Sequence, residues 1–247
     1  MVGKKKMTNV SFPMRPPAWS YSSISLYKTC PKKYYAERVS KEIPYLESEA
    51  QRYGTELHLA AEEYIRDGKA LDPRFGFMLP VLEKLASKPG VFHCEMKLGL
   101  KKEGDRYVSC EFFDKEVWFR GVADLVILCG DKAYIVDYKT GKSSRYADTT
   151  QLDLMAAAIF IKYPQVKKIY AALIFVVLIT REGMTEDDWF IRANYDRDQA
   201  LAVFSKLYPH LEQRSQSYDT GVFNPSPNGL CKAWCAVSSC PHHGGRR

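Results

Sequence analysis

The feature of this chain that most constrains its fold is an unbroken apolar run over residues 169–179. Polar and apolar residues do not alternate in this run, so it predicts a strand that is buried on both faces. Its longest purely apolar part, residues 171–179, has nine residues, which is about half the length needed to cross a bilayer. The run therefore favours a protein whose sheet is covered by helices, rather than a membrane protein.

Patterns on either side of this run predict the remaining elements. Apolar residues at helical spacing over residues 53–66 predict an amphipathic helix that ends at Asp67-Gly68. Runs rich in β-branched and aromatic residues predict strands in the centre of the chain. The expected helices begin near Ser20 and cover residues 53–66, 75–87, 149–163 and 196–213, and the expected strands cover residues 91–100, 107–113, 117–128, 133–137, 169–179 and 189–193. This arrangement predicts the α/β class, with a mixed central sheet flanked by helices.

The charge balance and the cysteines narrow the class of protein further. The 247 residues include 36 Lys and Arg against 29 Asp and Glu, which gives a net charge of +7. Lys4, Lys5 and Lys6 supply three of these charges, so the rest of the chain is only mildly basic, which permits nucleic-acid binding without proving it. No secretion signal follows these lysines, and seven cysteines is an odd number. We therefore expect a cytoplasmic protein (host cytoplasm if the chain is viral), whose cysteines bind metal or stay reduced.

Two consecutive expected strands each carry one acid in apolar surroundings, Asp124 and Asp137. An unpaired charge there costs several kcal/mol, so we expect the two carboxylates to face a cation, and Mg²⁺ suits oxygen ligands of this kind. Side chains two apart on a strand share a face, so Lys139 is expected beside Asp137, while Tyr138 points back into the fold. An acid that holds metal then lies beside an amine that can orient a water or offset charge on a phosphate.

These residues resemble a known signature. Asp124 followed by Asp137-Tyr138-Lys139 is similar to the motif of the PD-(D/E)XK nuclease superfamily. The continuation to Asp-Tyr-Lys-Thr-Gly resembles the branch of RecB-like and AddB-like exonucleases and CRISPR-associated iron–sulfur adaptation nucleases. Gly-Thr-Glu-Leu-His, which ends at His58, resembles that branch's helical Gly-x-x-x-His element, and Gln151 resembles its later helical Gln motif.

The resemblance implies a fold and a set of roles. It implies a restriction-endonuclease-like core and a DNA exonuclease that depends on Mg²⁺ or Mn²⁺. The residues implied to hold the metal are His58, Asp124, Asp137 and Tyr138, the last through its carbonyl. Lys139 is implied to act on the reacting phosphate, Glu95 occupies a strand position where the family often has an acid near the metal, and Gln151 completes the catalytic set.

Four cysteines form a second candidate metal site. Cys30 lies near the start of the chain, and Cys231, Cys235 and Cys240 lie close together near its end. In the exonucleases that the chain resembles, one early and three late cysteines bind a 4Fe–4S cluster, and four thiolates are suited to this. Zinc is the alternative, because the three late cysteines with His242 or His243 also make a four-ligand site, and a tail without metal is the third reading.

Basic and aromatic residues give candidate contacts to DNA. Lys32, Lys33, Lys142 and Arg145 are expected to contact phosphates, and Tyr35 is expected to stack on bases, as are Tyr34 and Tyr146. DNA is the expected partner, with a helicase, recombinase or integrase as a possible further partner and no membrane.

Together these features predict three segments: a basic, disordered or extended N-terminus (1–19), a nuclease domain (20–217), and a cysteine-rich tail (218–247) that packs back on the N-terminal helix through a metal cluster. The predicted function is hydrolysis of phosphodiester bonds in single-stranded or end-containing DNA. The alternative is a catalytically weak DNA-binding or scaffold subunit of the same fold, active only within a larger recombination or replication complex.

Overall fold

The computed structural model describes residues 10–44, 46–145 and 147–245. The first nine residues of the expected N-terminal segment 1–19, and Tyr146, lie outside this range. Contacts divide the chain into two compact units, one of Glu47–Phe204 and one of Met1–Leu46 together with Ser205–Arg247. The limits expected from the sequence at residues 20 and 218 remain a prediction.

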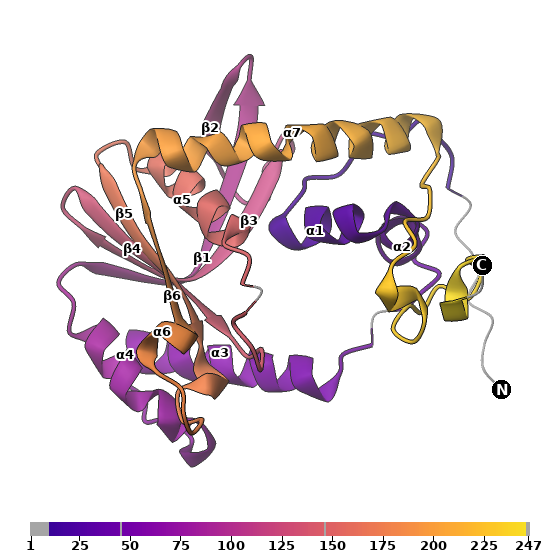
Figure 1. Ribbon diagram of the computed structural model, residues 1–247. Helices are drawn as coiled ribbons and strands as arrows, with labels where there is room; N and C mark the ends of the chain where they lie inside the picture. Colours follow the sequence, from indigo (N-terminus) through magenta and orange to yellow (C-terminus); the bar gives the residue numbers. More distant parts are fainter. Residues whose placement is uncertain (1–9, 45, 146, 246–247) are drawn as a thin grey trace. The chain divides into compact units, whose positions relative to one another are not determined.

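The Glu47–Phe204 unit is built on one six-stranded sheet (Figure 1). Its strands are β1 (Val91–Glu103), β2 (Arg106–Cys110), β3 (Phe119–Cys129), β4 (Lys132–Lys139), β5 (Lys168–Phe175) and β6 (Phe190–Tyr195). They lie in the order β2-β1-β3-β4-β5-β6. β4 and β5 are parallel, and the other neighbours are antiparallel. The mixed central sheet predicted from the sequence is confirmed.

Helices cover both faces of this sheet (Figure 1). α3 (Glu49–Asp67) and α4 (Leu79–Ala86), with the 3-10 turn Pro73–Met78 before it, pack on one face in a shared apolar cluster with residues of β3, β4 and β5. α5 (Thr150–Lys162) covers the other face with a nearly continuous buried surface, and α6 (Glu186–Trp189) is a short helix before β6. The predicted α/β class is therefore confirmed. No helix in the part of the chain that the structure describes is long and apolar enough to cross a membrane.

Local interactions fix where α3 begins and ends. The Ser48 hydroxyl accepts the N–H of Gln51, and the Gln51 side chain accepts the N–H of Ser48, which satisfies two backbone donors at the start of the helix. Gly68 ends the helix in the left-handed conformation that glycine adopts without steric cost. These two caps set the ends of the helix that carries His58, and its apolar face, packed in the cluster on the sheet, sets its rotation.

Three expected boundaries were wrong. β2 ends at Cys110 rather than at residue 113, because the chain turns at Glu111–Asp114. β5 ends at Phe175, and Val176–Leu178 form a buried 3-10 turn, which has the same apolar composition as a buried strand and so cannot be distinguished by pattern. α7 (Arg197–Thr220) continues seven residues past the expected end at residue 213.

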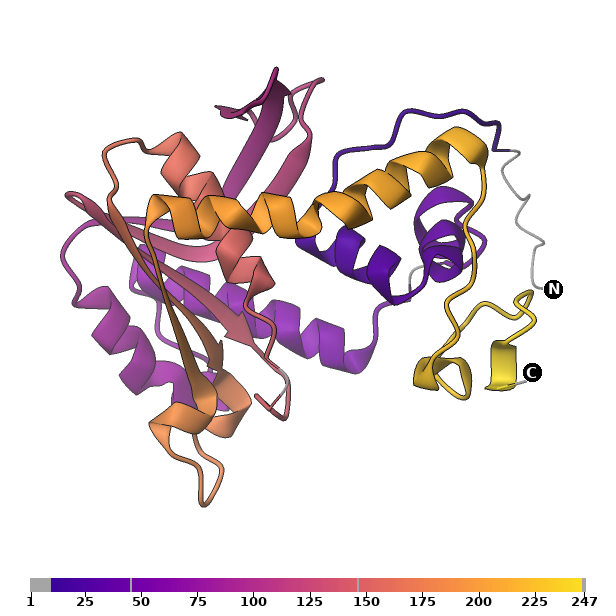
Figure 2. The ribbon, with the colours of Figure 1, turned by 45° about the horizontal axis from the view of Figure 1, so that its top comes forward.

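The second unit contains α1 (Tyr21–Thr29), α2 (Pro31–Tyr34), the π-helical turn Tyr35–Val39, most of α7 and the tail. Its core is polar at one point. The buried Arg214 guanidinium donates to the Tyr34 hydroxyl (2.9 Å) and the Pro17 carbonyl (2.9 Å), and it lies over the Tyr34 and Tyr218 rings. The tail returns to the junction of α1 and α2, because Asn228 donates to the Thr29 carbonyl (3.2 Å). Figure 2 shows this tail, with its 3-10 turns Gly229–Cys231 and His243–Gly245.

Candidate functional site

The sheet is loosened around Asp124. On β1, Glu95 has a positive φ of 47°, a backbone conformation that is unfavourable for a residue with a side chain. The residues on either side of Glu95 and Asp124 pair between β1 and β3, but these two residues are not paired. The β3–β4 pairing runs from Cys129 and Lys132 to residues 125 and 136, and it stops before Asp124 and Asp137.

This distortion changes the faces that the strands present. Leu125 and Ile127 pack in the apolar cluster with α3 and α4, whereas Gly121 faces Met155 of α5. Residues four apart on a regular strand share a face, so β3 switches faces between Gly121 and Leu125. Asp124 lies at the switch, and its Oδ2 accepts the N–H of Tyr138 on β4 at 2.7 Å. The carboxylate thus replaces a missing ladder bond while it turns toward α3.

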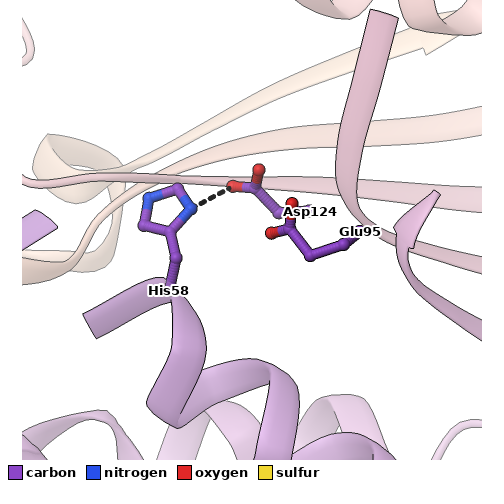
Figure 3. A group of neighbouring side chains, drawn as sticks. All are labelled: His58, Glu95 and Asp124. Carbon is purple, nitrogen blue, oxygen red and sulfur yellow. Dashed lines mark ion pairs between the residues drawn. The ribbon is translucent and has the colours of Figure 1, made fainter. Parts of the chain in front are cut away.

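His58 meets this carboxylate from α3. Its Nδ1 lies 3.3 Å from Asp124 Oδ2, and donor atoms of His58, Glu95 and Asp124 lie within 4.8 Å of one another (Figure 3). One turn before His58, a Cβ added at Gly54 would lie 3.4 Å from Thr140 Oγ1, so glycine lets α3 lie close to the end of β4. Two carboxylates and one imidazole thus converge from three elements, which is a donor set suited to a divalent cation such as Mg²⁺ or Mn²⁺.

Asp137, Lys139 and Gln151 form the other half of the site. Lys139 Nζ lies 2.6 Å from Asp137 Oδ2 and donates to Gln151 Oε1 at 2.7 Å. Gln151 Nε2, in the first turn of α5, donates to Asp137 Oδ1 at 2.5 Å. One amide therefore holds the acid and the amine in a fixed relation, with Asp137 buried and Lys139 31% exposed.

Burial and the neighbouring charges together raise the pKa values of three residues in this group. Burial lowers the pKa of His58, but the hydrogen bond and charge of Asp124, with Asp137 and Glu95, outweigh it and raise the value. Burial, followed by the charge of Asp124, raises the pKa of Glu95. Burial and then Asp124 raise the pKa of Asp137 to about 6, although Lys139 opposes the shift. Crowded carboxylates of this kind are relieved by a cation, so the electrostatics agree with the donor set.

The Tyr138 side chain lies on the opposite face of β4 from Asp137 and Lys139 and points into the fold, as the strand alternation predicts. Its ring is buried in the cluster with α3 and α4, and its centroid lies 6.0 Å from that of His58, edge to face. Burial raises the pKa of its hydroxyl, which has no hydrogen-bond partner among the described residues. The main chain of Tyr138 therefore faces Asp124, while its ring supports the imidazole.

Comparison with known proteins decides the family. The sequence pattern of the PD-(D/E)XK nuclease superfamily matches residues 18–241, which is most of the chain. This chain belongs to the PD-(D/E)XK nuclease superfamily. A solved structure titled "Crystal structure of SSO0001" is 15% identical, with 94% of this chain and 89% of that chain covered and a TM-score of 0.43. None of the curated proteins compared with the chain matches it.

Within this PD-(D/E)XK domain, six residues singled out in the sequence form two neighbouring groups, linked by the Tyr138 N–H that Asp124 accepts: His58, Glu95 and Asp124 in one, and Asp137, Lys139 and Gln151 in the other. Asp137, expected as a metal ligand, is not part of the group of possible metal ligands among the described residues. The other candidates lie elsewhere. Lys142 and Arg145 are exposed on the loop after β4. Lys32, Lys33 and Tyr35 belong to the other unit, where Lys33 pairs with Glu37 (3.7 Å) and Tyr35 packs on Phe223.

The sequence did not reveal the double contact of Gln151 or the backbone distortion at Glu95. The contact of Gln151 could have been expected from its position, because Gln151 lies in the first turn of the helix that follows the strand of Asp137 and Lys139. A positive φ at a glutamate has no signal in the sequence, since it arises where the β1–β3 ladder is interrupted beside the end of the β3–β4 ladder.

The four cysteines lie in the second unit and line one apolar cavity with His242 and His243. The N–H of Ser226 donates to Cys30 Sγ and that of Asn228 to Cys231 Sγ, both at 3.4 Å. Backbone N–H groups directed at sulfur stabilise thiolates, so this set fits a group bound by thiolates.

Proposed function

We propose that the protein is a DNA exonuclease that hydrolyses phosphodiester bonds with Mg²⁺ or Mn²⁺, and that it acts on single-stranded or end-containing DNA. Membership of the nuclease superfamily supports the reaction class. The observation that carries the proposal is that two pairs have their acids on adjacent strands, His58 with Asp124 (3.3 Å) and Lys139 with Asp137 (2.6 Å), with the N–H of Tyr138 bonded to Asp124.

His58, Glu95 and Asp124 are the proposed metal ligands, with Asp137 and the carbonyl of Tyr138 beside them. A divalent ion held there supplies a nucleophilic water at neutral pH and offsets charge on the phosphate. Asp124 is oriented for this by the Tyr138 N–H, which fixes one of its oxygens. Because the ligands come from α3, β1 and β3, the site depends on the packing of α3 against the sheet.

Lys139 is the proposed catalytic cation. Gln151 holds its Nζ, so the amine does not need to be ordered when substrate binds. In the reaction, the water oxygen loses a proton to solvent and bonds to phosphorus, the bond from phosphorus to the leaving oxygen breaks, and that oxygen takes up a proton from solvent. Charge accumulates on the phosphate oxygens in between. An ammonium fixed beside them stabilises that charge more than it stabilises the ground state.

The test is to compare wild type with Lys139→Ala on linear, closed circular and end-blocked DNA in Mg²⁺ and Mn²⁺. We expect wild type to degrade linear DNA only, and Lys139→Ala to bind DNA but lose at least about 100-fold in rate. Lys84→Ala, an exposed lysine on α4, is the matched control. Cleavage of closed circles by wild type would replace exonuclease with endonuclease, and unchanged cleavage by Lys139→Ala would remove its role.

DNA is the proposed partner, with Lys142 and Arg145 as phosphate contacts near Lys139, and Lys32, Lys33 and Tyr35 as contacts from the other unit. A helicase, recombinase or integrase partner remains a proposal, as does a location in the cytoplasm. If the protein cleaves only after a copurifying ATPase or integrase is added back, the scaffold alternative replaces an autonomous exonuclease.

We further propose that Cys30, Cys231, Cys235 and Cys240 bind a 4Fe–4S cluster that fastens the tail to α1 and α2. These four cysteines line one cavity, and Cys30 and Cys231 each accept a backbone N–H, which supports a group bound by thiolates. Zinc, held by three of the cysteines with His242 or His243, is the alternative. Anaerobic purification with metal analysis tests this: iron with a brown chromophore supports the cluster, and stoichiometric zinc replaces it.

A further inference from the structure

A turn at the end of β2 presents two aromatic side chains where turns usually have small or polar residues. The N–H of Asp114 donates to the Glu111 carbonyl at 3.0 Å, so Phe112 and Phe113 are the two central residues. The Asp114 carboxylate accepts the N–H of Glu116 at 2.7 Å, which fixes the exit of the turn. Phe113 is 74% exposed. A rigid turn thus holds a large apolar ring in solvent, where it contributes nothing to the core.

A glycine brings this turn over the sheet. At Gly99 on β1, an added Cβ would lie 2.8 Å from the Cys110 carbonyl oxygen and 2.9 Å from that of Glu111. Any larger residue would push the end of β2 away from β1. The close approach lets Phe112 and Phe113 lie over β1 and β3, with their ring centroids 5.0 Å apart and their planes at 83°.

Two cations lie beside these rings. Lys97 Nζ is 6.0 Å from the Phe112 centroid and 5.8 Å from that of Phe113, and the Arg120 guanidinium is 5.5 and 5.7 Å from the same two centroids. Neither cation has a carboxylate partner within 4.0 Å in residues 10–44, 46–145 and 147–245. Their charges are therefore available to an anion.

The cluster of Phe112, Phe113, Lys97 and Arg120 lies on the same face of the sheet as the proposed metal site. Gly121 faces α5, so its neighbour Arg120 points to the opposite face. Lys97 pairs with Val122, the other neighbour, and so shares that face. This is the face on which α3 carries His58. Lys97 is two residues from Glu95, about 7 Å along the strand, which is close to the span of one or two nucleotides.

We propose that Phe113, supported by Phe112, Lys97 and Arg120, is a stacking platform that binds a base and the adjoining phosphates of single-stranded DNA next to the metal site. Exposed aromatic rings stack on any base, and unpaired lysine and arginine attract phosphates, so the cluster combines the two components of sequence-independent single-strand binding. In a duplex the base faces are covered, so the platform selects a frayed or single-stranded segment. This inference rests on the proposed nuclease function for the identity of the substrate.

The test measures binding separately from cleavage. Wild type, Phe113→Ala and Phe113→Trp are titrated by fluorescence anisotropy with a labelled oligothymidine in EDTA, where cleavage does not interfere. We expect Phe113→Ala to weaken DNA binding about tenfold, because it removes the ring on which a base stacks. Phe113→Trp should keep wild-type affinity, because it retains an aromatic ring. Because Phe113 is largely exposed, its loss leaves the fold intact, which circular dichroism checks. Tyr170→Ala, which removes a 40% exposed ring elsewhere on the same sheet, is the matched control.

A second measurement identifies stacking as the cause. A set of oligonucleotides carries one abasic site each, at successive positions along the strand. Wild type should bind one of them about tenfold more weakly than the others, whereas Phe113→Ala should bind all of them equally. Lys97→Ala should reduce the number of ions released on DNA binding, measured from the salt dependence of the affinity, by about one, whereas Lys84→Ala should leave it unchanged.

The outcomes separate the two proposals. Unchanged DNA affinity of Phe113→Ala, or an equal loss in Tyr170→Ala, overturns the platform while leaving the nuclease proposal intact. Loss of affinity in Phe113→Ala together with no cleavage by wild type under any metal condition supports the platform and overturns the nuclease proposal. If Phe113→Ala loses DNA affinity but no abasic position weakens binding to wild type, base stacking on Phe113 is overturned and the loss is assigned to a change in the protein fold.

Discussion

Replacing Asp137 by Asn should make the metal-free protein more stable while it abolishes cleavage. Asp137 is 4% exposed, and burial with the nearby charge of Asp124 raises its pKa from 3.8 to about 6. The folded state therefore disfavours the carboxylate at neutral pH. Asparagine has the shape of the protonated acid and keeps an acceptor for Gln151. It loses the pair with Lys139, whose effect the raised pKa of Asp137 already includes, and Lys139 keeps Gln151 Oε1 as its acceptor.

The magnitude follows from the pKa difference. A rise of about two pH units corresponds to about 3 kcal/mol of destabilisation at pH values above both pKa values. Because the folded pKa lies above the unfolded one, the folded state binds more protons between about pH 4 and pH 6. The contribution of Asp137 to stability is therefore complete below 3.8 and is lost as the pH rises through about 6. The gain from Asp137→Asn should be absent near pH 4 and largest at pH 7 and above.

Urea unfolding in EDTA, with wild type and variant compared at pH 4, 5, 6 and 7.5, measures this difference. Asp131→Asn, at a 56% exposed side chain, is the matched control and should show no such pH-dependent gain. Adding Mn²⁺ should then stabilise wild type more than Asp137→Asn, because the variant lacks one of the carboxylates whose charge attracts the cation. The reasoning is refuted if Asp137→Asn is no more stable than wild type at pH 7.5, or if its gain is the same at every pH.

Three further predictions address other parts of the structure. His58→Ala removes one proposed ligand, so calorimetry should show Mn²⁺ binding weakened at least about tenfold with the fold retained; unchanged affinity would exclude His58 from the site. Arg214→Ala leaves buried polar groups without their hydrogen-bond partner, so urea unfolding should show a loss of about 3 kcal/mol in the free energy of unfolding. The control Arg192→Ala, at a half-exposed side chain, should lose less than about 1 kcal/mol, and equal losses would contradict this. Gly121→Ala places a Cβ 2.4 Å from Met155 Cε and should cost about 1–3 kcal/mol, part of which a smaller residue at 155 recovers; no cost would mean that the strand face is misassigned.

The sequence predicted the structure best where the apolar composition of a segment and the spacing of its side chains led to the same conclusion. A doubly buried strand at residues 169–175 requires helices on both faces, and the chain supplies them. Asp137 and Lys139 share a face because side chains alternate along a strand. This relation follows from their spacing of two residues and needs no information from the rest of the chain. Boundaries failed where buried turns and strands have the same composition, as at Val176–Leu178, and where aromatic residues suggested that β2 would continue to Phe113.

Only the tertiary structure decided how these residues meet. The positive φ of Glu95, the loss of pairing at Asp124 and the switch of β3 from one face to the other arise from three strands acting on one another. The approach of His58 and the bridging of Asp137 and Lys139 by Gln151 depend on how α3 and α5 pack on that distorted sheet. Local spacing determines which side chains share a face, since that follows from backbone geometry. Distances between elements are set by packing between residues far apart in the chain, and no short segment encodes them.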